Sequence, residues 1–219
     1  MGLEDRVKCQ CFDTTSSNTG HMNGACVLLE QKLGHQMLHL ACRHHVHEIV
    51  LEAVTVTCLG PSTGPDIALF KRFQGQWQFI DQEKFEILTV DENEQEFVSV
   101  DDTILFAKEQ LKKYQPRDDY KELLELSIIA LGGVPERGIR FRLPGALHRA
   151  RWMAKAIYGT KIFPFRKQFK LTKREEKGMW NLTVFVIGIY IKHWFTAPSA
   201  VRAPPNDLEF LKKLNHIKS

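Results

Sequence analysis

The alternation of strand and helix patterns in residues 7–59 constrains the fold of this chain more than any other feature. Short apolar runs bounded by turn-forming residues predict strands, and apolar residues at helical spacing predict helices. Strands are predicted at residues 7–12 and 37–41, and helices at residues 23–33 and 45–59. Such alternation within a short stretch indicates α/β organisation.

Asp13 directly follows the first predicted strand, and Thr, Ser, Asn and Gly residues come after it. The helix between the two strands would make a right-handed crossover, so the strands should pair in parallel. The carboxyl ends of parallel strands lie at one edge of a sheet, where the chemistry of α/β proteins is usually found. We therefore expect a buried strand at residues 7–12, with Asp13 at the carboxyl edge of the sheet.

A segment of Gly, Pro, Ser and Thr at residues 60–65 ends the α/β pattern. Beyond it, helical spacing, Asp and Asn caps and Gly or Pro stops predict a mostly helical region. The predicted helices cover residues 66–80, 101–115, 118–131, 146–157 and 179–195, with a last one from residue 206. The predicted fold class is α/β, a partial sheet in a domain at residues 7–59 with an attached, mostly α-helical domain at residues 66–219.

Two segments of the first domain carry a resemblance to a known family. Residues 11–18, Cys-Phe-Asp-Thr-Thr-Ser-Ser-Asn, resemble the second acidic motif of hAT-type transposases. Residues 42–50 are similar to the Cys-x-x-His motif of that family, in which Cys42 and His45 open the next helix. The resemblance implies a partial RNase H-like sheet, with Asp13 as a catalytic acid and as a ligand of divalent magnesium or manganese.

The parent activity that this resemblance implies is metal-dependent DNA cleavage and strand transfer. The first and last catalytic acids of the family have no visible counterpart here, so whether the chain is an enzyme stays open. We expect a transposase-derived fragment that binds nucleic acid and is inactive alone, with a divalent metal only if the site is complete. The alternative is a non-enzymatic protein-interaction domain.

The motif residues also have structural interpretations. Two-metal phosphoryl transfer needs several carboxylates, and Asp13 alone cannot supply them. Asp13 would otherwise only accept hydrogen bonds from the Thr-Ser turn. Cys42 and a neighbouring His could supply two zinc ligands. No clear second pair of ligands accompanies them, so we favour packing of Cys42 between helix and sheet.

Charge is unevenly distributed along the second domain. Residues 81–125 hold 14 acidic and 6 basic residues, whereas residues 137–177 hold 13 basic and 2 acidic residues. The second stretch would attract a phosphate backbone and the first would repel it, which predicts a DNA-binding face. The residues assigned to this face are Arg149, Arg151, Lys155, Arg166, Lys167 and Lys170.

Aromatic residues lie between these cations, and they could stack on unpaired bases. They are Phe141, Trp152, Tyr158, Phe163, Phe165 and Phe169. In the alternative interpretation Trp152 and Phe163 belong to the core and the charges make a solvated face. Trp77, at helical spacing from Phe70 and Phe73, is expected in the core.

Cysteine usage and apolar runs bear on the compartment. All five cysteines lie in the first 58 residues and no signal-peptide pattern precedes them. Reduced, buried thiols in an intracellular protein, nuclear or cytoplasmic, are therefore expected. The longest apolar run, residues 179–191, has 13 residues and is too short to span a bilayer. We expect DNA as a partner and no membrane, with a protein partner or an oligomer left open.

Overall fold

The computed structural model describes residues 6–62, 66–90, 98–145 and 153–217. Contacts divide the chain into two compact units, Met1–Ile49 and Val50–Ser219, called unit 1 and unit 2 below. The division falls inside helix α3 (Arg43–Leu59), whereas the sequence suggested a division after residue 59. It falls there because Leu51 is fully buried in the core of unit 2, and Val54 packs against the same core.

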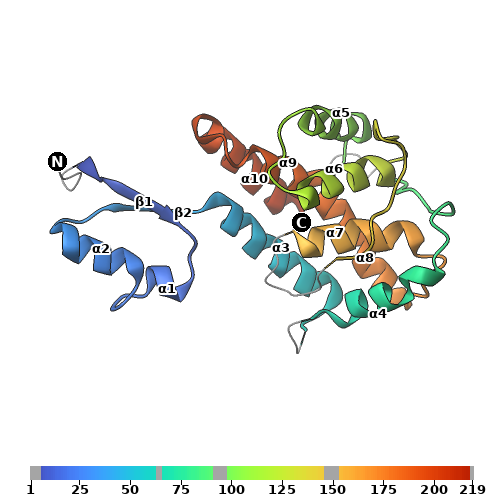
Figure 1. Ribbon diagram of the computed structural model, residues 1–219, viewed down its shortest axis with the longest axis horizontal. Coiled ribbons are helices and arrows are strands. Elements are labelled where there is room, and N and C mark those ends of the chain that lie inside the picture. Colours follow the sequence, from blue (N-terminus) through green and yellow to red (C-terminus); the bar gives the residue numbers. More distant parts are fainter. Residues whose placement is uncertain (1–5, 63–65, 91–97, 146–152, 218–219) are drawn as a thin grey trace. The chain divides into compact units, whose positions relative to one another are not determined.

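Unit 1 contains two parallel strands, β1 (Cys9–Phe12) and β2 (Leu38–Ala41), with Cys9 opposite Leu38. Helices α1 (Ser16–Thr19) and α2 (Ala25–Leu33) lie between them in the chain (Figure 1). Gly34 ends α2 at a φ of 73°, in the left-handed region that favours glycine. The predicted parallel pairing across a helix is confirmed, and the short helix α1 is an addition to it.

The prediction of a buried first strand is wrong. Cys9 and Cys11 are exposed on β1, and Leu38 and Leu40 on β2 keep 62% and 45% of their surface exposed. The cysteines are free thiols, and Cys26 alone of the five is buried. Two short strands with α1 and α2 offer too little apolar surface to enclose a sheet, because a parallel sheet normally needs cover on both faces.

The described residues of unit 2 are mostly helical, as predicted, and irregular segments such as residues 80–90 and 131–145 connect the helices. Its first half holds α4 (Ala68–Gln76), the 3-10 turn η2 (Trp77–Phe79), α5 (Val100–Leu111), α6 (Asp118–Ala130), α7 (Ala154–Ile162) and the 3-10 turn η3 (Phe163–Phe165). Its second half holds α8 (Lys173–Phe185), the π-helical η4 (Val186–Tyr190), α9 (Ile191–Thr196), the 3-10 turn η5 (Ala200–Arg202) and α10 (Ala203–Ile217). None of the helices described is both long enough and apolar enough to cross a membrane.

Helices α6, α7 and the continuous run from α8 to α9 form the centre of unit 2. Pairs α5–α6, α6–α7 and α7–α8 pack against one another, and Figure 1 shows α7 between α6 and α8. The core is rich in aromatic side chains, and Trp77 is among them at 7% exposed, as expected. Tyr158 of α7 stacks on Phe70 of α4 at 4.6 Å between ring centroids.

Helix α7 differs from the predicted helix at residues 146–157. It begins at Ala154 and continues through Gly159 to Ile162, and residues 146–152 lie outside the described part of the chain. Gly159 should lie beyond the end of the predicted helix. Instead it faces α8, where an added Cβ would lie 3.2 Å from the side chain of Leu182. The glycine therefore serves close packing between two helices, which no local pattern shows.

Candidate functional site

The edge of the small sheet in unit 1 holds the predicted motif residues. Asp13 follows β1 directly, and its Oδ1 accepts hydrogen bonds from the Thr15 amide at 3.1 Å and hydroxyl at 2.5 Å. The Asn18 side-chain amide donates to the same oxygen at 2.7 Å. The Thr15 bonds hold the pKa of Asp13 below its usual value, and Asn18 and the nearby His45 act in the same direction. Asp13 is thus an ionised carboxylate that organises the turn into α1.

Cys42 and His45 lie at the same edge, because β1 and β2 run parallel. The Cys42 amide donates to the Phe12 carbonyl at 2.9 Å and extends the ladder by one bond. Its carbonyl accepts from Val46 at 3.1 Å in the first turn of α3. Cys42 and His45 are both partly buried. The structure therefore brings the three motif residues to one end of the sheet, as the predicted topology requires.

The described residues at this edge do not make a complete divalent-metal site. Among the residues that the structure describes, no group of three or more His, Cys, Asp or Glu side chains is placed to hold a metal ion. A two-metal site needs several carboxylates around the cations, and Asp13 is the one carboxylate with motif support. The hydrogen bonds of Asp13 match the expected turn-organising role and extend it to the side chains of Thr15 and Asn18.

The predicted DNA-binding face of unit 2 is only partly at the surface. Arg149 and Arg151 lie outside the described residues. Lys155 was expected to point outward, but it is 5% exposed and its Nζ lies 2.9 Å from Glu52. Lys161 is 1% exposed and donates to Glu122 and, at 3.0 Å, to the Arg142 carbonyl. Burial lowers the pKa of Lys161, and Glu122 offsets part of this effect.

Arg166 and Lys167 contact an acid of the acidic stretch. The carboxylate of Glu86 lies 4.0 Å from Arg166 and 3.0 Å from Lys167. The Arg166 guanidinium also lies over the Phe163 ring at 4.0 Å from its centroid. Glu86 and Glu122 come from the acidic stretch and their partners from the basic one. Part of the charge asymmetry is therefore neutralised inside the molecule, and does not form two opposed surfaces.

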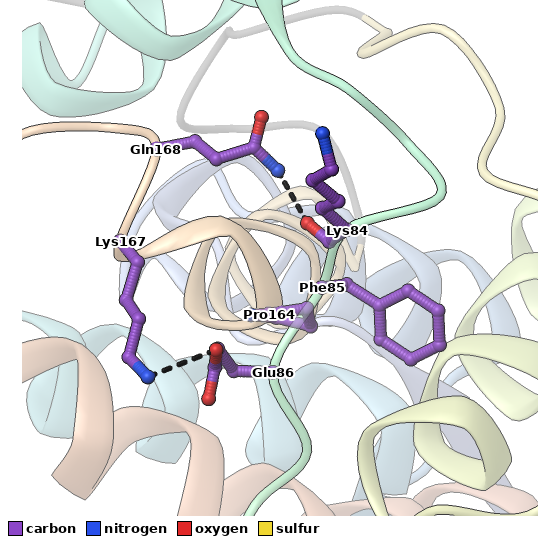
Figure 2. Close-up of a pocket in the computed structure, with 6 residues that line it drawn as sticks. All are labelled: Lys84, Phe85, Glu86, Pro164, Lys167 and Gln168. Carbon is purple, nitrogen blue, oxygen red and sulfur yellow. Dashed lines mark hydrogen bonds and ion pairs between the residues drawn. The ribbon is translucent and has the colours of Figure 1, made fainter.

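A pocket of about 430 Å³ lies where residues 81–86 meet residues 164–168 (Figure 2). Lys84, Phe85, Glu86, Pro164, Lys167 and Gln168 line it. The Gln168 side chain accepts from the Asp81 amide at 2.8 Å and donates to the Asp81 carbonyl at 2.8 Å and to that of Lys84. The Glu86 amide donates to the Pro164 carbonyl at 2.8 Å. These bonds hold two segments together, so the pocket is best explained as a structural junction.

Four cations remain exposed at the start of α8 and in the turn before it. Lys170, Lys173, Arg174 and Lys177, together called the α8 basic surface, form no ion pair with another described residue. Of the two acids nearby, Glu175 is held by Arg72 at 3.0 Å and by the Thr172 amide at 2.8 Å. Lys170 was a predicted site residue. The other three belong to the same run of charges, and helical spacing from residue 173 would have placed Lys173 and Lys177 on one face.

The aromatic residues between the cations are mostly core. Phe141, Tyr158, Phe163, Phe165 and Phe169 are each at most 9% exposed, and Trp152 lies outside the described residues. The expected core position is therefore confirmed for Phe163, and the other four are buried as well. Trp180, which the sequence did not single out, is partly exposed and packs edge-on against Phe163 at 5.3 Å.

A second pocket, of about 470 Å³, lies between η3 and α8. Phe163, Arg166, Lys173, Glu176, Lys177 and Trp180 line it. It therefore joins the α8 basic surface to the partly exposed indole of Trp180.

Protein-family models, curated proteins and solved structures offer no match to this chain.

Proposed function

We propose that this protein binds nucleic acid through the α8 basic surface. The observation that carries the proposal is the exposure of Lys170, Lys173, Arg174 and Lys177 without ion-pair partners among the described residues. Lysine and arginine side chains that are not already neutralised gain most from a polyanion, because phosphate contacts release condensed counterions. Buried cations such as Lys155 and Lys161 take no part, since they hold unit 2 together.

We further propose that residues 7–59 derive from the RNase H-like core of an hAT-type transposase. Support comes from the parallel strands, from Asp13 at their carboxyl ends and from Cys42 and His45 at the start of α3. The parent activity would be metal-dependent cleavage and strand transfer of DNA. This chain alone is proposed to lack that activity, because one carboxylate does not build a two-metal site.

A salt titration of duplex DNA affinity tests the binding proposal. Changing Lys170 and Arg174 together to Ala should weaken binding to all sequences alike. The plot of log affinity against log salt should become shallower by roughly two, since each lost phosphate contact removes about 0.9 from the slope. The matched control changes two exposed lysines of the acidic stretch, Lys112 and Lys113, to Ala. That control should leave both the affinity and the slope unchanged. The proposal is refuted if the change of Lys170 and Arg174 leaves duplex affinity at the wild-type value.

A protein-interaction role is the second candidate, and the open sheet of unit 1 favours it. Leu38 and Leu40 are 62% and 45% exposed on β2, and Leu28 of α2 and Ile49 of α3 are each 50% exposed. Apolar side chains that gather in one small unit commonly mark a protein contact. If unit 1 self-associates, the sedimentation coefficient of the protein should increase with protein concentration. Changing Leu38 and Leu40 to Ser should abolish this increase. The control is Val201→Ser, which alters an exposed apolar residue of unit 2.

A further inference from the structure

The pocket between η3 and α8 combines cations with a partly exposed aromatic ring. Lys173 and Lys177 are one helical turn apart, and Trp180 follows three residues later, so all three share one face of α8. The edge contact of Trp180 with Phe163, at an interplanar angle of 65°, holds the indole in place. Arg166 borders the same space, and its guanidinium is held over the Phe163 ring.

Glu176 also lines this pocket and narrows the class of ligand. Its carboxylate opposes a bare anion such as inorganic phosphate, because like charges repel at short range. It suits a ligand that carries an amino group as well as a negative charge, since a carboxylate accepts hydrogen bonds. A nucleotide matches the cations, the indole and the carboxylate of the pocket. It carries a phosphate, a flat aromatic base and, in three of the four bases, an exocyclic amino group.

We propose that this pocket receives one unpaired nucleotide of a single strand, with its base on Trp180 and a phosphate beside Lys173 and Lys177. The inference rests on the proposed nucleic-acid binding and adds a preference to it. Duplex bases are stacked and paired, so their faces are closed to an indole, whereas phosphates are available in both forms. Lys170 and Arg174 do not line the pocket, so they contact either form equally.

The test compares a short single strand of mixed sequence with the duplex that it forms with its complement, at one salt concentration and with the full chain. Wild type should bind the single strand about tenfold more tightly, which is the scale of one stacked base. Trp180→Leu should remove this preference and leave duplex affinity unchanged, while Trp180→Phe should keep most of it. Lys170→Ala, outside the pocket, should weaken both complexes alike.

The affinities of wild type and Trp180→Leu for the two probes decide whether the pocket binds an unpaired nucleotide. If wild type binds the two probes with equal affinity, the pocket inference is wrong and duplex binding by the α8 basic surface still stands. The same conclusion follows if Trp180→Leu folds and weakens both complexes alike. Absence of binding to either probe overturns this inference and the proposed function together. Should Trp180→Leu fail to fold, tryptophan fluorescence decides. The single strand must quench wild-type emission more strongly than that of Trp180→Phe, and equal quenching refutes the pocket assignment.

Discussion

The buried imidazole of His193 in α9 should make the stability of unit 2 depend on pH. Its side chain is 2% exposed, and its ring lies 4.8 Å from that of Phe210 on α10. Burial lowers the pKa of His193 from 6.5 to about 4. Lys213 and Lys192 lower it further, and Glu209 and Asp207 oppose them. The imidazole is therefore neutral in the folded protein at neutral pH.

The sign of the pH effect follows from which state binds more protons. Between about pH 6.5 and about pH 4 the unfolded chain protonates this histidine and the folded chain does not, so stability falls as pH falls. Each pKa unit corresponds to about 1.4 kcal/mol, so the loss reaches about 3 kcal/mol near pH 4. Above about pH 6.5 both states hold a neutral ring, and this contribution no longer changes with pH.

Denaturant unfolding of wild type and His193→Gln at about pH 7.5 and about pH 4 measures this contribution. All 4 tryptophans of the chain lie between residues 77 and 194, so their fluorescence reports unit 2 alone. The free energy of unfolding of wild type should fall by about 3 kcal/mol more than that of the variant over this range. Carboxylates titrate in both proteins, and their effect largely cancels in the comparison. Equal losses in the two proteins would refute the neutral, buried histidine.

Two further predictions concern a helix contact and catalysis. Gly178→Ala should destabilise unit 2 by about 1–3 kcal/mol, because the added Cβ would lie 2.3 Å from the Cys58 carbonyl oxygen. Gly75→Ala in α4 has nothing within 4 Å of the added Cβ and should stabilise slightly, by up to about 1 kcal/mol, in the same thermal unfolding assay. Wild type should show no more magnesium-dependent nicking of duplex DNA than Asp13→Ala, in a plasmid relaxation assay. Nicking that needs magnesium and disappears in the variant would show that further carboxylates complete a metal site with Asp13.

Local patterns were enough to predict most of the secondary structure. The parallel pair β1 and β2 follows from two short apolar runs separated by a helix, and α2 ends at Leu33, the last residue of the predicted helix. The helical character of unit 2 follows from apolar residues at helical spacing. The edge position of Asp13, Cys42 and His45 follows in turn, because parallel strands end at one side.

Patterns along the chain could not show which charges meet. Lys155, Lys161 and Lys170 look alike in a basic run, yet the fold buries the first two against Glu52 and Glu122 and leaves the third exposed. Their partners are distant in sequence, so only the packing of α3, α6 and α7 decides the outcome.

The sequence by itself thus determined where helices and strands form, because backbone preference and apolar spacing act over a few residues. Only the tertiary structure decided which side chains remain available to a ligand. It left the strands of unit 1 exposed, turned Gly159 into a helix contact with Leu182, and placed Trp180 at a pocket beside Lys173 and Lys177. The physical reason is that burial and charge pairing depend on contacts between segments far apart in the chain, which no local pattern encodes.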